Sequence, residues 1–297
     1  MGKDRRGKFC ASDGFRGNGG LMELLNEDQV NTMLAGQTVD RIEAMEAMML
    51  EQPQVEVPVD EQFINGMYAR EILIPEGTLL TGAVHKDAHF AIMLSGDIAV
   101  ATPNGVQRMT GSHVMEGKPG WKRAAYAFED TRWLTVHRTD HYEEGEMLDM
   151  LTFPTTGQYR EFVRNRDYAS YLSVIEAFGM TEGEVQVMVQ NESDQVDLPT
   201  RYGDRVTVSP SYIHGNGLQS CRDFEMGETV GPARTAEGDR TIIGRYSNHS
   251  ANPNAIMELA EDNSVWMVAT RQINVSDEIT THYGITLQSV QGVLCHQ

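Results

Sequence analysis

The chain has few cysteines, no long apolar run and a shortage of basic side chains. Its three cysteines, Cys10, Cys221 and Cys295, are spread over 297 residues, so we expect neither a disulfide framework nor a clustered zinc site. No apolar segment is long enough for a signal peptide or a bilayer span. We therefore expect synthesis inside the cell, a cytoplasmic location and no membrane partner.

The charge excludes one class of partner and favours another. With 24 Lys and Arg against 43 Asp and Glu, the formal net charge is −19, which argues against general nucleic-acid binding. The excess lies in residues 141–200, which hold twelve acids against three Arg. This distribution suits a basic protein partner, and it equally suits a solvated surface that keeps the chain soluble.

Residues 1–60 are expected to form a basic flexible arm followed by short helices. Residues 1–20 carry five basic side chains, two acids and several glycines, a composition typical of mobile termini. From Leu21 to Met49 the apolar residues recur at helical spacing on both sides of Gly36, which predicts two short helices. Pro53 and Pro58 then favour an extended linker.

Residues 61–140 carry the pattern of an antiparallel β-barrel. Short β-runs, among them Ala69–Ile74, His89–Leu94, Ile98–Thr102 and Trp133–His137, alternate with turns such as Ser95-Gly96-Asp97.

Several residues within 63–138 resemble the cupin family, in particular the small cupin-like domains of tailed-phage proteins. They are Gly82, His85, His89 and Gly96, followed by Pro119-Gly120. The resemblance implies a phage-encoded chain, present in the host cytoplasm or associated with the virion.

A cupin metal site needs histidines that converge from neighbouring strands, usually as His-x-His, with a Glu and a further His. Here His85 and His89 are four residues apart, and the Glu and the His after Pro119-Gly120 are not in place. His113 and His137 remain as candidate third ligands. Because only two ligands are in register and a divalent site needs three, we expect no metal and a barrel used for packing or oligomer contacts.

Residues 141–200 are expected to form an acidic helical connector. Glu143–Leu151 is acidic and amphipathic, and Tyr159–Phe178 carries aromatic and aliphatic residues near a 3.6-residue period until Gly179 ends it. The aromatic residues suit packing on one of the flanking domains.

Residues 201–297 return to strands, at Arg205–Ser209, Thr229–Pro232, Ala255–Leu259 and Val265–Ala269. Three segments stand out for their polar and glycine-rich composition. They are Tyr212-Ile213-His214-Gly215-Asn216-Gly217-Leu218, Gly244-Arg245-Tyr246-Ser247-Asn248-His249-Ser250-Ala251-Asn252-Pro253-Asn254, and Asp277-Glu278-Ile279-Thr280-Thr281-His282-Tyr283-Gly284.

In that order, over about residues 205–284, the three segments resemble the motifs of SET-domain protein methyltransferases. The resemblance implies S-adenosylmethionine as cofactor, with Gly215, Asn216 and Gly217 shaping a close backbone approach to it. It also implies that Asn248 hydrogen-bonds the methionine part, that the His249 backbone reads the adenine edge, and that Tyr283 is the catalytic residue. Taken singly, each motif is also explained by an ordinary turn or a packed side chain.

The side of the site that would accept the methyl group departs from the family pattern. Thr281 stands where an aromatic residue is usual, and His282 where Asp is frequent. The interval from Gly231 to Ser247 is short, and the three-cysteine zinc motif that often follows the domain is absent. Leu287, Val290, Val293 and Leu294, or a neighbouring subunit, would have to close the channel.

We therefore expect a mainly β chain with α segments: a cupin-like antiparallel β-barrel followed by a β-rich SET-type domain. The favoured function is a protein-lysine N-methyltransferase acting on a protein substrate. The alternatives are a non-catalytic structural or assembly protein of a phage particle, in contact with other phage proteins, and a metal-dependent cupin enzyme. Exposed sheet edges also make a homo-oligomer an expectation.

Overall fold

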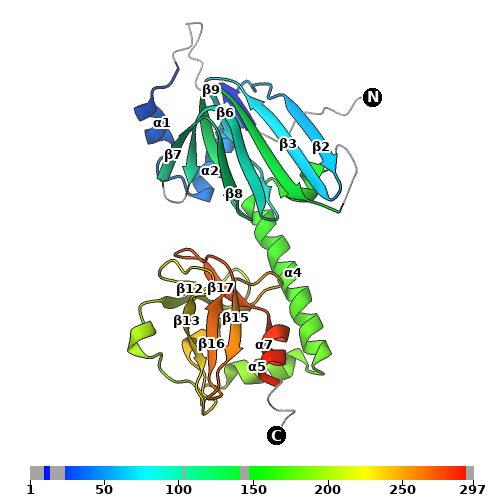
Figure 1. The fold of residues 1–297 in the computed structure, drawn as a ribbon, viewed down its shortest axis with the longest axis vertical. Coiled ribbons are helices and arrows are strands. Elements are labelled where there is room, and N and C mark those ends of the chain that lie inside the picture. The colour runs from blue at the N-terminus through cyan, green and yellow to red at the C-terminus, as the bar shows by residue number, and fades with distance from the viewer. Residues whose placement is uncertain (1–9, 14–23, 103–104, 141–146, 292–297) are drawn as a thin grey trace. The chain divides into compact units, whose positions relative to one another are not determined.

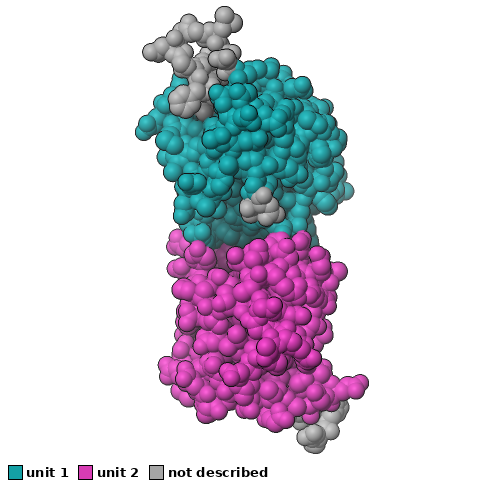
Figure 2. Space-filling model, turned by 90° about the vertical axis from the view of Figure 1, so that its left-hand side faces the viewer, with its two compact units in different colours: residues 1–160 teal, residues 161–297 magenta. Residues whose placement is uncertain are grey.

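A computed structural model describes residues 10–13, 24–102, 105–140 and 147–291, with side chains in all of these except 10–13 and 288–291. The chain is mainly β with a few helices, as expected, and divides into two compact units, residues 1–160 and 161–297 (Figure 2). No helix in the described ranges combines the length and apolarity needed to cross a membrane.

Unit 1 begins with the two short helices that the spacing predicts, α1 (Glu27–Leu34) and α2 (Val39–Leu50). Asn26 caps α1 through a capping box with Gln29, and Gly36 has a φ of 61° in the turn between the helices. Most of the predicted basic arm lies outside the described residues, although Cys10–Asp13 form a strand, β1, paired with Thr78–Thr81.

The rest of unit 1 is an antiparallel sheet organised by two long strands, β6 (His89–Thr102) and β9 (Ala124–Arg138) (Figure 1). β9 pairs with β6, β3 and β4, and β6 pairs also with β7 and β8. The other strands of this sheet are β2 (Val59–Ile64), β3 (Met67–Ile74), β4 (Thr78–Thr81), β7 (Gly105–Thr110) and β8 (His113–Gly117). A separate strand, β5 (Val84–His85), pairs with Thr152–Phe153.

Both faces of this sheet are buried where α1 and α2 cover it. Because successive strand residues point to opposite faces, Leu79 and Tyr126 pack with α1 and α2, whereas Leu80 and Ala125 pack on the opposite face. This second face also carries Ile72, Ile74, Met93, Ile98, Val100, Met109 and Ala127, and it forms the interior of the barrel.

The turn predicted at Ser95-Gly96-Asp97 is wrong, because β6 runs through these residues as one strand with shifts of register. Gly96 has a φ of 116°, and a Cβ there would lie 2.4 Å from Thr131 Oγ1. A glycine in a strand is a sign of a bulge as well as of a turn, and here the strand bulges and continues.

The predicted connector is largely helical. It contains α3 (Met147–Leu151), β10 (Thr152–Phe153), α4 (Thr156–Ala177) and α5 (Glu182–Gln190), while residues 141–146 lie outside the described ranges. Gly179, with a φ of 66°, follows the end of α4 as predicted. The division between the units falls within α4, so α3 and β10 belong to unit 1 and α5 to unit 2.

Unit 2 contains a four-stranded sheet, in the order β11-β12-β17-β14, and a three-stranded sheet, β13-β16-β15. Both contribute to one apolar core with fully buried Leu218, Phe224, Ile243, Met267 and Ile279. The strands are β11 (Val206–Pro210), β12 (Asn216–Ser220), β13 (Thr229–Arg234), β14 (Asn248–His249), β15 (Ala255–Leu259), β16 (Val265–Ala269) and β17 (Glu278–Thr281). The 3-10 turn Thr200–Tyr202 and helices α6 (Ile242–Tyr246) and α7 (Tyr283–Gln291) complete it.

Candidate functional site

In unit 2 the Glu278 carboxylate joins the three sequence motifs. The Ser211 hydroxyl lies 2.8 Å from both carboxylate oxygens, and the Asn248 amide nitrogen lies 2.8 Å from Oε1. Glu278 lies within the third motif, and its pattern there predicts no role for it. No local signal marks it, because its place beside the glycine loop (residues 214–217) follows from the pairing of Gln219 in β12 with Glu278 in β17.

Asn248 holds the glycine loop from the other side. Its amide nitrogen also lies 3.1 Å from the His214 carbonyl and 3.2 Å from the Asn216 carbonyl. Among the described residues nothing donates to its amide oxygen, so that acceptor remains available to a ligand.

The two glycines of the loop have different surroundings. Gly215 has a φ of 51° with open space where a Cβ would be, whereas a Cβ on Gly217 would lie 2.3 Å from Glu278 Oε1. The close approach at Gly217 is therefore to Glu278, and the exposed backbone of Gly215 and Asn216 is the part of the loop open to a cofactor.

His249 is buried and bound at both ring nitrogens. Its Nδ1 accepts from the Tyr283 backbone N–H at 3.1 Å, so its Nε2 carries the proton and donates to Ser170 Oγ at 2.9 Å. Burial, followed by the charge of His282, lowers the pKa of His249 to about 4. The ring is therefore neutral at pH 7, and its two hydrogen bonds connect Ser170 in α4 to Tyr283 at the start of α7.

The Tyr283 hydroxyl donates to the Ser247 carbonyl at 3.1 Å. Burial, with smaller effects of Tyr171 and Glu278, raises the pKa of Tyr283 to about 12. The phenol therefore keeps its proton at neutral pH, so it can donate a hydrogen bond but does not act as a base.

Helix α4 supplies residues to this site that the sequence analysis missed. Besides Ser170, the buried Asp167 accepts from the Ala251 backbone at 3.0 Å, which fixes the loop after His249. The Tyr171 ring lies 6.3 Å from the Tyr283 ring, edge to face, and 6.2 Å from Tyr168, stacked. The aromatic spacing in residues 159–178 is the sequence feature that points to these residues, but by itself it predicts only packing.

Thr281 and His282 also differ from what the resemblance led us to expect. Thr281 is fully buried and pairs with His249 in parallel strands, so it does not line an open channel. His282 borders a cavity of about 270 Å³ with Gly284 and Ile285. The other wall is formed by Ser170, Ser173, Val174 and Ala177 of α4 and by Phe178, which follows the helix. This volume is close to the lower end of the roughly 300–1,000 Å³ range of small-molecule pockets.

Of the four residues predicted to close the channel, only some lie among the described residues. Leu287 is half-buried in α7, the side chain of Val290 is outside the described set, and Val293 and Leu294 lie outside the described ranges.

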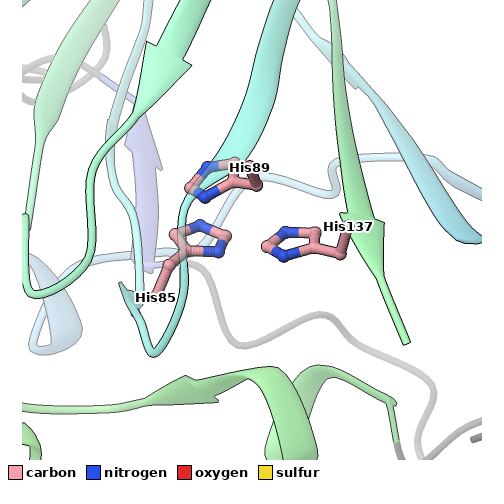
Figure 3. Close-up of side chains that lie close together, drawn as sticks. All are labelled: His85, His89 and His137. Carbon is pink, nitrogen blue, oxygen red and sulfur yellow. The ribbon is translucent and has the colours of Figure 1, made fainter. Parts of the chain in front are cut away.

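In unit 1, His85, His89 and His137 converge at the start of β6 and the end of β9 (Figure 3). One nitrogen from each lies within 4.8 Å of the other two, and the ring centroids are 3.9 to 4.9 Å apart. The sequence places only two candidate ligands in register and so predicts no metal, whereas β9 brings His137 to the group as a third. His113 makes its contact elsewhere, with the Thr110 carbonyl.

The chemistry of this three-histidine cluster fits a transition metal. Burial lowers the pKa of all three histidines, that of His137 to about 3, so each imidazole is neutral and offers a lone pair. His85 Nδ1 is buried with no hydrogen-bond partner among the described residues. The His89 Nδ1 lies 3.2 Å from the Asp87 carbonyl, an outer contact that would orient a metal-binding ring.

Comparisons with solved structures find likenesses to separate parts of the chain. A cupin superfamily protein from Desulfitobacterium hafniense is 10% identical, covering 32% of this chain and 87% of that one, with a TM-score of 0.26. A cupin-2 domain protein from Shewanella frigidimarina is 9% identical, covering 32% and 91%, with a TM-score of 0.24. Both match the N-terminal part.

A Plasmodium falciparum protein named as a candidate histone methyltransferase is 20% identical, covering 27% of this chain and 94% of that one, with a TM-score of 0.24. No conclusion about activity follows from any of these likenesses. No curated protein sequence matches the chain.

The family comparison covers most of the chain. The model of the SET domain matches residues 74–284, a range that contains all three motifs joined by Glu278 and that begins earlier than the expected 205, within unit 1. The chain belongs to the SET-domain family, whose members are methyltransferases.

Proposed function

We propose that unit 2 transfers a methyl group from S-adenosylmethionine to the side-chain nitrogen of a lysine in a basic protein. The observation that supports this most directly is the hydrogen-bonded convergence of the glycine loop, Asn248, His249 and Tyr283. Family membership supports the reaction class, and the net charge of −19 favours a basic partner.

On the donor side, S-adenosylmethionine would supply the methyl group on a sulfonium. The free amide oxygen of Asn248 suits an ammonium donor such as that of the methionine part, and the exposed loop at Gly215 and Asn216 offers backbone groups beside it. His249 is committed through both ring nitrogens, so only its backbone is available to a ligand. The residues present therefore fit the cofactor.

On the acceptor side, Tyr168 stacks on Tyr171, and the Tyr171 ring meets Tyr283 edge to face. The Tyr168 hydroxyl donates to Glu182 at 3.1 Å. Aromatic faces next to a carboxylate attract a lysine side chain and its methylated forms. This group would take the place of the aromatic residue absent at Thr281. Since Tyr283 stays protonated, the lysine must lose its proton to solvent before it attacks.

Calorimetry with S-adenosylmethionine, followed by radiolabelled transfer to lysine-rich peptides, tests the proposal. We expect binding by the full chain, a loss of at least 10-fold in Asn248→Ala, and no change in Asn165→Ala, an exposed asparagine on α4. Absence of cofactor binding by the natural chain would refute the enzymatic proposal. Binding without transfer to any basic protein would favour the scaffold alternative.

The phage origin and virion association stay predictions that mass spectrometry of purified particles would test.

A second function, favoured by the convergence of His85, His89 and His137, is binding of a divalent transition metal in unit 1. Ligation at 2.0–2.1 Å would draw the three nitrogens, which lie within 4.8 Å of one another, somewhat closer together. Metal analysis of protein purified without chelators and reloaded with Zn²⁺, Mn²⁺ or Ni²⁺ would measure the stoichiometry. One equivalent per chain is expected.

A further inference from the structure

The barrel interior of unit 1 contains a cavity of about 110 Å³ beside the three-histidine cluster. Its walls are mainly apolar, formed by Ile72, Ile74, Leu80, Ile98 and Val100, which belong to the inner core face. An engineered apolar cavity of about 150 Å³ admits benzene. The space here is therefore suited to a molecule of only a few non-hydrogen atoms.

The charges around this cavity are all of one sign. Arg70, Lys118 and Arg123 line it, and the described lining residues include no aspartate or glutamate. Arg70 is compensated by an ion pair with Glu61 at 2.9 Å.

Lys118 and Arg123 form no ion pair among the described residues. Arg123 Nη2 donates to the Glu116 carbonyl at 3.1 Å, and its guanidinium lies 5.3 Å from the Trp121 ring. Burial lowers its pKa, and its charge is among the smaller causes that lower the pKa of His85 and His89, after burial. A partly desolvated cation without a counterion is costly unless an anion joins it.

We propose that the barrel binds a small organic anion, with a carboxylate directed to Arg123 and the three-histidine cluster and a short apolar body among Ile72, Ile98 and Val100. The site is independent of methyl transfer in unit 2. It also does not require a metal, although a divalent ion on three neutral imidazoles would add two positive charges and strengthen the demand for an anion.

Intrinsic fluorescence can follow binding, because Trp121 and Trp133 line the cavity and Trp266 lies in unit 2 as a constant background. The full chain would be titrated with acetate, propanoate and butanoate, and with the neutral amides of the same acids, before and after EDTA treatment. We expect each acid to bind about 10- to 100-fold more tightly than its amide, the contribution of a charge-assisted hydrogen bond.

Arg123→Met should abolish this preference, whereas Arg123→Lys should retain part of it. The matched control is Arg132→Met, an exposed arginine of the same barrel that pairs with Glu71. Equal binding of acids and amides by the natural chain, or an unchanged preference in Arg123→Met, would overturn the proposal. A preference that persists after EDTA supports an anion site separate from any metal. If Arg123→Met fails to fold, the comparison of acid with amide in the natural chain decides alone.

Discussion

The two candidate sites are built in opposite ways. In unit 2 the key side chains bind one another: Glu278 holds Ser211 and Asn248, and His249 connects Tyr283 to α4. In unit 1 the three imidazoles face one another without hydrogen bonds between them, and His85 Nδ1 has no partner among the described residues.

The difference indicates how each site is held in shape. Unit 2 has a preorganised network, in which the groups that would touch a ligand are backbone atoms, one amide oxygen and one phenol. In unit 1 the strands hold the three imidazole rings in place. The lone pairs on the ring nitrogens are then available to bind a ligand. Removing a residue should therefore damage the geometry in unit 2 and the ligand affinity in unit 1.

The largest effect is expected from Tyr283→Phe. This change removes the phenol O–H that donates to the Ser247 carbonyl and would orient the reacting groups. We expect the methyl-transfer rate to fall by about 10²- to 10³-fold, with S-adenosylmethionine binding changed less than about threefold. Single-turnover transfer and calorimetry measure the two quantities. Tyr202→Phe, whose ring packs on Trp266, is the control. A rate that survives in Tyr283→Phe would contradict the assigned role.

The next effect concerns the three-histidine cluster. His137→Asn removes the ligand that β9 contributes and should lower metal affinity by about 100-fold or more, since two histidines do not form a divalent site. Competition with a chromogenic chelator gives the affinity. His113→Asn, on the same barrel, should bind metal like the natural chain. Equal loss in both variants would show that general destabilisation, and not ligation, is being measured.

A pH effect should follow from His249. Its pKa is about 4 when folded and near 6.5 in an unfolded chain, so between these values the unfolded chain binds a proton that the folded chain excludes. The free energy of unfolding should fall as pH decreases from 6.5 to 4, and His249 should contribute about 1.4 kcal/mol per pH unit. Urea unfolding of the full chain and of His249→Gln at several pH values gives the difference in slope. Identical slopes would mean that His249 is not held neutral.

The smallest effect is expected at Tyr171. Tyr171→Ala should raise the KM for lysine peptides by roughly 2- to 30-fold, the contribution of one cation–π contact, whereas Tyr171→Phe should retain most of the affinity. Steady-state kinetics with both variants would separate the ring from its hydroxyl. A fall in kcat without a change in KM would instead indicate that α4 positions His249 and Tyr283.

Much of the fold could be predicted because its signals are local. Gly36 and Gly179 mark helix ends, and in Val265–Ala269 the alternate residues Val265, Met267 and Ala269 are buried as their spacing predicts. The predicted turn at Gly96 is wrong, because glycine is common both in turns and in β-bulges. The contact of Gly96 with Thr131, on a distant part of the chain, marks the bulge.

In the two candidate sites as well, features with a local signal could be predicted and contacts between distant segments could not. Residues 212–218, 244–254 and 277–284 were identified from the sequence because each motif is contiguous, but their connection through Glu278 depends on pairing between distant strands. His137 lies 48 residues beyond His89. The sequence marks it only as a candidate third ligand, because no local pattern shows that its strand, β9, pairs with β6.

The amino-acid pattern was enough to assign the class of each region: a mainly β chain with two histidines in the barrel and an ordered set of SET-type motifs. Three further features emerge only from the folded chain: β9 adds His137 to the cluster, α4 supplies Ser170 and Tyr171 to the motif site, and Arg123 lines an apolar cavity with no acidic residue among its described lining. The physical reason is that periodicity and motif composition act within a few residues, whereas these contacts are fixed by strand register and packing between distant segments.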